Sequence, residues 1–339
     1  MIIFADPIFG HAGYAHAVRN LALALSKHTN VNVLPQGSGY LPEKFYKLLG
    51  NKGATNKDYL VVRPYFDDPF KYNFPGRIIG NVVLESTLPE KMVKQCNDDR
   101  IWQIWVPSTF VKDNAIKSGV IERKIKVVPH GHDPDIFKVS RKKDSFVPYD
   151  FLFVGGYTGR GDRKGADKIV KAFTEEFKEG ESSLYLKINT VYGECPIQDL
   201  AIRKDITVDL NQYTDSEMAD VYRKAKYYIC PSAAEGFDMS CLQALACGMP
   251  VISSSTGQSD YLNYLLRFNG HIHRLEGSPQ PARFSPWDTG LWYPIDLKGI
   301  KHALRLYHKS KPKNLKFKGI EKWTWNASAK IAMRCLNGK

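Results

Sequence analysis

The first part of the chain alternates short apolar runs with amphipathic stretches. Apolar runs that predict β-strands begin at Ile2, Val31, Tyr59, Arg77, Ile101 and Lys124. Between the first two runs, apolar residues recur at helical spacing and predict a helix over 15–27. Nearly continuous apolar strands that alternate with helices are typical of a parallel, doubly wound sheet.

A polar stretch over 138–148 interrupts this alternation and is interpreted as a linker between domains. A second series of predicted strands follows, beginning at Asp150, Leu184, Asp205, Lys226 and Pro250. Helices are again predicted between them, and a final helix is predicted over 324–336. We therefore expect an α/β protein with one Rossmann-like domain over 1–140 and a second over 148–320.

The composition is that of a soluble globular protein. Of its 339 residues 43% are hydrophobic and 24% are charged, and no window approaches the ~20 consecutive apolar residues of a membrane span. Six cysteines are scattered without close pairs. This pattern favours reduced thiols and a cytoplasmic location.

The net charge of +13 is uneven along the chain. Residues 301–339 contain eleven lysines and arginines and one acid, Glu321. Such a basic segment is suited to nucleic acid, an acidic glycan or an anionic membrane surface, where the protein would be peripheral. The alternative, a solvated lysine-rich helix face, is the favoured interpretation.

The motif EGFDMSCLQALACGMP, residues 235–250, follows a predicted strand that ends near Ser232. It predicts a glycine turn and a helix over 239–247 that Gly248 and Pro250 end. The N-terminus of a helix at the carboxyl end of a strand offers free N–H groups and a positive dipole end, which suit a phosphate. Glu235 lies at the entrance of this turn.

A second motif, VGGYTGRGDRKG over 154–165, lies between a predicted strand and a helix. Its glycines allow a ligand to approach the backbone, and its cations, Arg160, Arg163 and Lys164, can neutralise negative charge. It is neither a P-loop nor a G-x-G-x-x-G fingerprint. Taken alone, it could equally be a flexible surface turn.

Residues 235–251 resemble the signature of retaining glycosyltransferases of family four, which have the GT-B fold. The matching positions are Glu235, Gly236, Phe237, Ala246, Gly248, Pro250 and Val251. Two positions depart from the family pattern: Asp238 replaces a small residue, and Gln243 replaces a second glutamate that accepts hydrogen bonds from the ribose of the donor. Gln243 retains a carbonyl acceptor but has no charge.

The resemblance implies roles for individual residues. Arg163 and Lys164, with Arg160 as a third cation, would hold the diphosphate of the donor. Glu235 would hold sugar hydroxyls, and the set of further donor-binding candidates is Gly13, Gly236, Phe237, Asp238, Met239 and Gln243.

Three candidates are assigned to the acceptor side. His11 and Tyr14 belong to FGHAGY, which resembles the N-terminal glycine loop of the family. Glu85 begins ESTLP, which resembles a segment of one branch, although a surface acid is an equal alternative. Asp238 presents a conflict, because a carboxylate that caps the helix would occupy N–H groups that a phosphate needs. We expect Asp238 to face a sugar hydroxyl instead.

For the whole chain, the resemblance implies a GT-B fold in which two parallel sheets face a central cleft, with a C-terminal helix over 321–339 that packs on the first domain. It implies a metal-independent, retaining transfer of a sugar from a nucleotide donor, a UDP- or GDP-sugar, to a glycan, a lipid-linked sugar or another hydroxyl acceptor, with no cofactor. Asp133-Pro134-Asp135 has the spacing of a metal-binding D-x-D but is interpreted as a coincidence. Two alternatives remain open: a nucleotide-sugar hydrolase or epimerase, and a non-catalytic sugar-nucleotide-binding module.

Overall fold

The computed structural model describes all residues except 51–52, 65–67, 69, 140–146, 160, 191–194, 283–288, 311–314 and 339. The chain forms two compact units. The first contains 1–131, a short stretch that ends at Gly290, and 323–339, and the second contains 132–284 and 291–322. The predicted linker over 138–148 lies largely outside the described residues.

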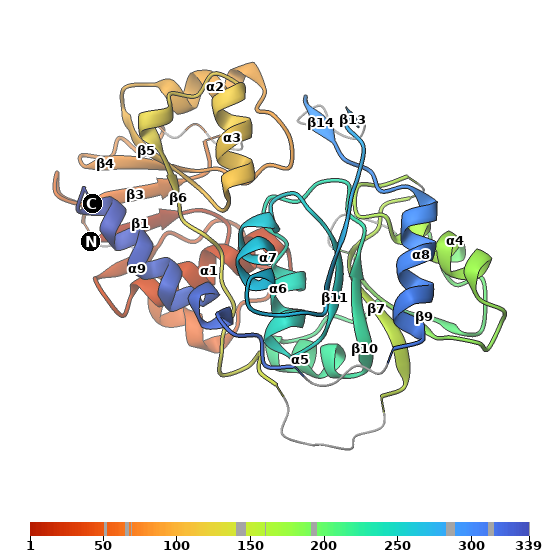
Figure 1. Cartoon of the computed structure of the whole chain (residues 1–339). Coiled ribbons are helices and arrows are strands. Elements are labelled where there is room, and N and C mark those ends of the chain that lie inside the picture. Colours follow the sequence, from red (N-terminus) through yellow and green to blue (C-terminus); the bar gives the residue numbers. More distant parts are fainter. Residues whose placement is uncertain are drawn as a thin grey trace. The chain divides into compact units, whose positions relative to one another are not determined.

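The first unit is built on a six-stranded parallel sheet (Figure 1). Its strands are β1 (Ile2–Ala5), β2 (Val31–Val33), β3 (Tyr59–Val62), β4 (Arg77–Asn81), β5 (Ile101–Val106) and β6 (Ile125–Val127). Their order across the sheet is β2-β1-β3-β4-β5-β6. Most residues of these strands are apolar because helices cover both faces of a parallel sheet.

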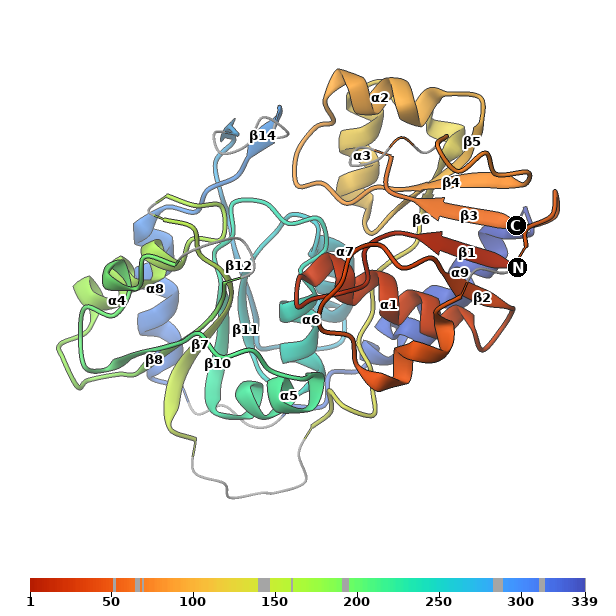
Figure 2. The same ribbon diagram turned by 180° about the vertical axis from the view of Figure 1, so that it is seen from behind.

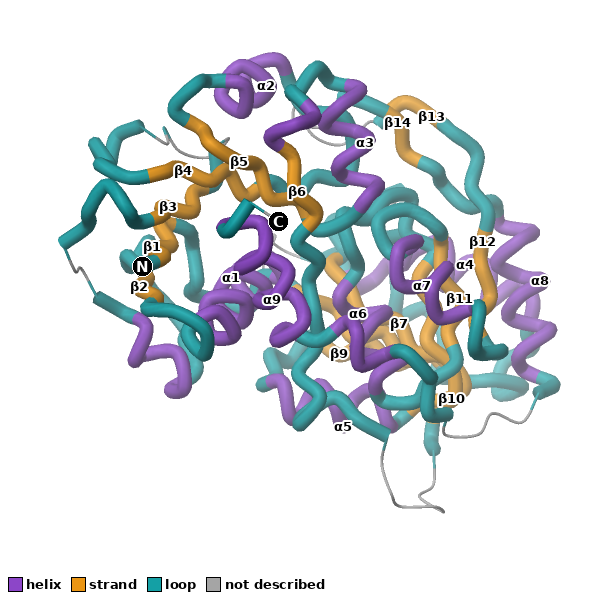
Figure 3. Tube along the Cα trace, turned by 60° about the vertical axis from the view of Figure 1, so that its left-hand side comes forward, coloured by secondary structure: helices purple, strands orange, loops and turns teal. Residues whose placement is uncertain are grey.

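The helices of the first unit are α1 (Gly13–Leu25), α2 (Glu90–Asn97), α3 (Thr109–Lys117) and α9 (Trp325–Leu336), with short 3₁₀ turns at Glu43–Leu48 and Glu122–Lys124. Helices α1 and α9 pack on each other on one face, and α2 and α3 cover the other (Figure 2). The hydroxyl of Thr324 accepts a hydrogen bond from the N–H of Ala327 and caps α9. Both ends of the chain therefore belong to this unit (Figure 3).

The second unit has a six-stranded parallel sheet of its own, in the order β12-β11-β10-β7-β8-β9. Its strands are β7 (Tyr149–Gly156), β8 (Leu184–Asn189), β9 (Ile206–Asp209), β10 (Ala225–Cys230), β11 (Val251–Ser254) and β12 (Ile272–Leu275). A separate antiparallel pair consists of β13 (Gln280–Pro281) and β14 (Leu291–Trp292).

The helices of the second unit are α4 (Ala166–Glu176), α5 (Asp215–Arg223), α6 (Met239–Ala246), α7 (Ser259–Leu266) and α8 (Leu297–His308), and 3₁₀ turns occur at Ile197–Asp199 and Ile320–Trp323. Helices α4 and α8 pack together on one face of the sheet, and α5, α6 and α7 lie on the other (Figure 1). Thr214 and Glu217 form a reciprocal capping box that fixes the start of α5. The parallel, doubly wound sheet predicted for each half is confirmed.

The strand orders define where ligands are expected. In the first sheet, the chain reverses direction across the sheet between β1 and β3, and in the second sheet between β7 and β10. In open parallel sheets, ligands bind outside the carboxyl ends of the strands at such switch points.

No helix among the described residues is long and apolar enough to span a bilayer.

Candidate active site

At the switch point of the second sheet, the loop after β7 and the loop after β10 are joined by hydrogen bonds. The glycine loop after β7 is tightened by Asp162, whose two carboxyl oxygens accept hydrogen bonds from the N–H groups of Thr158 and Gly165, both at 3.0 Å. Gly165 has a φ of 75° and precedes α4. From the loop after β10, the N–H of Ala233 donates to the carbonyl of Arg163 at 2.8 Å. The backbone therefore fixes Arg163 and Lys164 beside the loop that contains Glu235.

The side chains of these three residues form one charged cluster. The ammonium group of Lys164 donates to Oε1 of Glu235 at 2.6 Å, and a guanidinium nitrogen of Arg163 lies 3.3 Å from the same oxygen. Glu235 is only 5% exposed at its side chain, whereas Arg163 and Lys164 are 21% and 26% exposed. A ligand in solvent can therefore reach the two cations, while the carboxylate that orients them is buried.

The charges of this cluster hold one another in their ionised forms. Burial opposes the charged state of Lys164, but the adjacent Glu235 carboxylate raises the pKa of the ammonium group above its ordinary value. Burial likewise works against ionised Glu235, but Lys164 and Arg163 lower the pKa of its carboxyl group. The site therefore keeps two cations and a carboxylate at neutral pH.

A third loop, after β11, holds the backbone of Glu235, and sequence reasoning gave it no role. The hydroxyl of Thr256 accepts a hydrogen bond from the N–H of Glu235 at 2.8 Å, and the N–H of Gly257 donates to its carbonyl at 2.8 Å. A Cβ atom on Gly257 would lie 2.2 Å from that carbonyl oxygen, so only glycine fits. The side chain of Gln258 is fully buried and accepts from the hydroxyl of Thr256 at 3.0 Å.

The turn between Glu235 and α6 differs from the expectation for Asp238. The Oδ1 atom of Asp238 accepts a hydrogen bond from the N–H of Cys241 at 3.1 Å and caps α6. The expectation that Asp238 avoids the cap is therefore wrong, because its left-handed backbone, with φ of 60°, presents the carboxyl group to the first turn. Phe237 is buried with its ring 5.3 Å from that of Tyr261, and Met239 is partly exposed.

Gln243 is buried on α6, and its side chain already has a protein partner. The hydroxyl of Tyr222 donates to Oε1 of Gln243 at 3.0 Å. Because a carbonyl oxygen has two lone pairs, this hydrogen bond leaves capacity for a second donor on the same atom. The contact with Tyr222 was not predicted, since nothing in the spacing of the two residues indicates it.

The switch point of the first sheet carries a polar cluster that the sequence did not indicate. Asp6 follows β1 and is 0% exposed. Its carboxylate accepts hydrogen bonds from the hydroxyl of Tyr14 at 2.7 Å, from the amide of Asn81 at 3.2 Å and from Nε of Arg63 at 3.2 Å. The guanidinium group of Arg63 lies 3.1 Å from the centre of the Tyr14 ring. The available signal was positional: Asp6, Arg63 and Asn81 stand at the carboxyl ends of adjacent strands.

Burial raises the pKa of Asp6 to about 6, although Arg63, Tyr14 and Asn81 all favour its ionised form. Of the predicted residues in this unit, Tyr14 is part of the cluster. His11 stacks on Tyr40 with ring centres 4.3 Å apart, and Gly13 is the exposed first residue of α1. Glu85 lies partly buried in the loop between β4 and α2. Arg160, the predicted third cation, lies outside the described residues.

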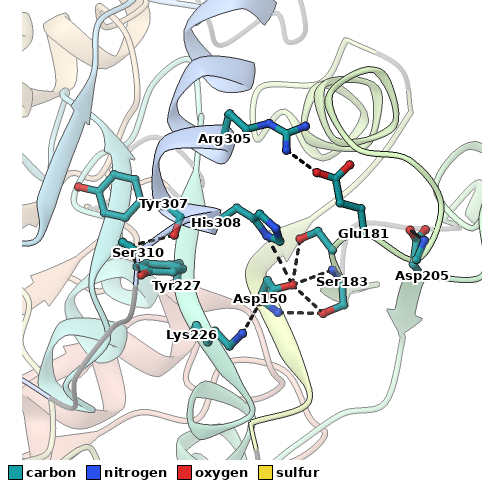
Figure 4. Close-up of polar contacts among 12 residues, drawn as sticks. Asp150, Glu181, Ser183, Asp205, Lys226, Tyr227, Arg305, Tyr307, His308 and Ser310 are labelled. Atoms are coloured by element: carbon teal, nitrogen blue, oxygen red, sulfur yellow. Dashed lines mark hydrogen bonds and ion pairs between the residues drawn. The ribbon is translucent and has the colours of Figure 1, made fainter.

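Part of the positive charge of the basic segment is neutralised within the second unit. Lys301 and Arg305 of α8 pair with acids at the end of α4 and just beyond it, namely Glu175, Glu176 and Glu181. Figure 4 shows Arg305 directed toward Glu181, and Lys226 paired with Asp150 on the adjacent strands. On α8, Lys301 and Arg305 are therefore paired with acids of the same unit.

Part of the chain is similar in sequence to known glycosyltransferases. Residues 148–266, which contain the charged cluster, match the family model described as Glycosyl transferases group 1. Over 114 residues the chain is 30% identical to an uncharacterized glycosyltransferase from Methanocaldococcus jannaschii, an alignment that covers 32% of this chain and 30% of the relative. Over 151 residues it is 28% identical to a D-inositol 3-phosphate glycosyltransferase from Stackebrandtia nassauensis, covering 40% and 34%. The chain thus spans about a third of the length of these relatives.

Solved structures resemble the whole chain. A glycosyltransferase from Rickettsia africae superposes with a TM-score of 0.70 at 14% identity and covers 99% of this chain and 98% of its own. Anabaena HepE, solved in complex with UDP-glucose, also superposes with a TM-score of 0.70 at 14% identity, covering 100% and 99%. The chain therefore has the two-domain Rossmann-like architecture of GT-B glycosyltransferases, and its second unit contains the segment that matches the group 1 family model.

Proposed function

We propose that the protein is a retaining glycosyltransferase that transfers a sugar from a nucleoside diphosphate donor to a hydroxyl acceptor without a metal ion. The observation that carries the proposal is the cluster of Lys164, Arg163 and Glu235 at the switch point of the second sheet. Structural neighbours solved with UDP and UDP-glucose support a nucleotide-sugar donor.

The two cations suit the leaving group of such a reaction. An ammonium group has three N–H donors and a guanidinium group has five, so Lys164 and Arg163 can bind Glu235 and phosphate oxygens at the same time. Negative charge grows on the diphosphate as the bond to the sugar breaks, and fixed cations in a partly buried site stabilise that charge. Glu235 is proposed to accept hydrogen bonds from sugar hydroxyls, as the resemblance implies, through the small part of its carboxylate that is exposed beside the two cations.

The bond between the anomeric carbon and the phosphate oxygen breaks, and its electron pair leaves with the nucleoside diphosphate. A bond forms from the acceptor oxygen to the anomeric carbon on the same face, and the acceptor proton passes to the leaving phosphate. No side chain is assigned as a base, and no cofactor takes part.

The first unit is proposed to bind the acceptor, a glycan or a lipid-linked sugar, and the protein is proposed to be cytoplasmic. His11, Tyr14 and Glu85 remain the candidate acceptor residues. The Asp6 network would fix the Tyr14 hydroxyl, because Asp6 and Asn81 both hydrogen-bond to it. UDP- and GDP-sugars are the proposed donors, and the uncharged Gln243 is the position at which ribose recognition would depart from the family pattern.

The test is release of nucleoside diphosphate from UDP-glucose, UDP-N-acetylglucosamine and GDP-mannose, with and without a panel of glycan and lipid-linked acceptors. A transferase releases diphosphate faster when its acceptor is present and forms a glycosylated product. Equal release without acceptor would indicate a hydrolase, and binding without release would indicate a non-catalytic module. Failure of every donor to bind would overturn the proposal.

A further inference from the structure

The candidate donor site contains a second acidic residue, Asp238, whose negative charge opposes the binding of a diphosphate. Besides the carboxylate of Glu235, the carboxyl group of Asp238 lies close enough to interact electrostatically with both Glu235 and Lys164. With both acids ionised, they cancel the charges of Arg163 and Lys164. A donor that carries two phosphates would then enter a cluster with no net positive charge, which is unfavourable for binding an anion.

The position of Asp238 differs from that of an ordinary helix cap. Its residue is 7% exposed, and its Oδ1 atom is used by the N–H of Cys241. The other oxygen, Oδ2, is buried without a hydrogen-bond partner among the described residues, and the nearby thiol of Cys230 is only a weak donor. Burying a charged carboxylate oxygen without a strong hydrogen-bond donor costs free energy. Burying the neutral, protonated carboxyl group costs less.

Among the titratable groups around it, Asp238 is the one whose charge can change near neutral pH. They come from two loops and four elements and are Lys164 and Glu235 in the loops, Cys230 and Tyr228 on β10, Cys241 on α6, Tyr222 on α5 and Tyr261 on α7. Burial raises the pKa of these thiols and phenols well above their ordinary values. Lys164 and Glu235 hold each other ionised.

Burial, and then repulsion from Glu235, raises the pKa of Asp238 to about 6. Asp238 is therefore mostly ionised in the empty site at neutral pH. Neutral pH lies only slightly above the pKa of its carboxyl group, so a small rise in that pKa leads to protonation. A diphosphate bound beside Lys164 adds negative charge nearby, and a like charge raises the pKa of a carboxyl group further. The electrostatics of the cluster thus couple anion binding to protonation.

We propose that Asp238 takes up a proton from solvent when the nucleotide-sugar donor binds, so that the site gains one positive charge as the diphosphate enters. This inference rests on the proposed function, since it takes the cluster as the donor site. It explains how a carboxylate can stand at the tip of α6, where the signature that the chain resembles has a small residue, without excluding phosphate. The protonated carboxyl group also becomes a hydrogen-bond donor, whereas the carboxylate can only accept.

The probe is the sugar diphosphate that binds most tightly among UDP-glucose, UDP-N-acetylglucosamine and GDP-mannose. Such diesters are suitable because they lack the terminal phosphate ionisation near pH 6 that free nucleotides have. Titration calorimetry at pH 7 in two buffers of different ionisation enthalpy counts the protons taken up. If binding raises the pKa of Asp238 by one unit, roughly 0.4 proton is taken up at pH 7, and affinity weakens by up to about tenfold as the pH rises from 5 to 8.

The variant Asp238→Asn keeps an oxygen that can cap α6 but cannot take up a proton. It should bind the donor with no proton uptake at pH 7 and with a flat pH profile, while Asp238→Ala separates the loss of the cap from the loss of the charge. Asp209→Asn, which changes another buried acid of the second unit, should retain the wild-type uptake. Donor binding without uptake in the wild-type protein, or unchanged uptake in Asp238→Asn, would overturn the inference alone. If the wild-type protein bound none of the donors, the proposed function and this inference would both fall.

Discussion

The ammonium group of Lys164 donates a hydrogen bond of 2.6 Å to Oε1 of Glu235, although 71 residues separate them in the chain. The two residues meet because β7 and β10 are neighbours at the switch point of the second sheet. The contact joins a cation suited to a leaving phosphate with an acid suited to sugar hydroxyls. It is the structural basis of the proposed activity.

Replacing Lys164 by alanine should lower donor-dependent turnover by ~100-fold or more, because it removes a cation that acts on the charge of the transition state. Steady-state rates of diphosphate release measure the effect. Lys171→Ala, which changes an exposed lysine of α4, is the matched control and should leave turnover unchanged. Similar rates for Lys164→Ala and Lys171→Ala would remove Lys164 from the site.

Gly257→Ala should destabilise the second unit and weaken donor binding together. The added Cβ would lie 2.2 Å from the carbonyl oxygen of Glu235, so the loop that holds Glu235 must shift. Overpacking of this kind costs about 1–3 kcal/mol in the free energy of unfolding. Chemical denaturation measures that cost. Gly270→Ala, where the Cβ meets nothing within 4 Å, is the control, and equal stability of the two variants would contradict the predicted clash.

Gln243→Ala should weaken binding of a nucleotide-sugar donor about fivefold, the equivalent of one neutral hydrogen bond. The physical reason is the second lone pair of Oε1, which Tyr222 leaves available to a ribose hydroxyl. Calorimetric titration with the donor measures the change, with the exposed Gln198→Ala as a reference. Unaltered affinity in Gln243→Ala would show that this position does not contact the ribose.

The free energy of unfolding should depend on Asp6 as the pH changes. Because the pKa of Asp6 in the folded protein is raised to about 6, above its ordinary value, its contribution is fully present below about pH 4 and is lost as the pH rises through 6. Asp6→Asn removes this titration, so its unfolding free energy should change less between pH 4 and 7 than that of the wild-type protein. Denaturant unfolding at several pH values measures it, and parallel curves for the two proteins would contradict the prediction.

Eleven strands of the two parallel sheets were predicted from the sequence, because most buried parallel strands are nearly continuous apolar runs. Strand β12, with its alternating sequence IHRL, was not predicted. The sequence also predicted the loops of Lys164 and Glu235, since glycines and charges at the ends of such strands leave a local signal. The role of Thr256 and Gly257 in holding Glu235, and the approach of Tyr222 to Gln243, depend on packing between distant segments. Asp6, Arg63 and Asn81 are single polar residues after separate strands, and only the strand order brings them together.

The resemblance also misdirected one prediction in an informative way. Asp238 stands where the signature that the chain resembles has a small residue, and it was expected to avoid the cap because a capping carboxylate occupies N–H groups that a phosphate needs. The structure instead shows a left-handed residue whose Oδ1 caps α6. The physical cost falls on Oδ2, which is buried and has no partner among the described residues stronger than the thiol of Cys230. The hydrogen bond from the N–H of Cys241 thus decides the orientation of the Asp238 carboxyl group, although the other acid of the cluster repels it.

The cluster of Lys164, Arg163 and Glu235 is proposed to bind the diphosphate of a sugar nucleotide. The most direct measurement compares the affinities of uridine, UDP and UDP-glucose, with the guanosine series in parallel, for the wild-type protein and Lys164→Ala. In one series the wild-type protein should bind the diphosphate far more tightly than the nucleoside, and Lys164→Ala should lose most of that difference. Equal binding of nucleoside and diphosphate in both series, or a difference that survives in Lys164→Ala, would contradict the proposal.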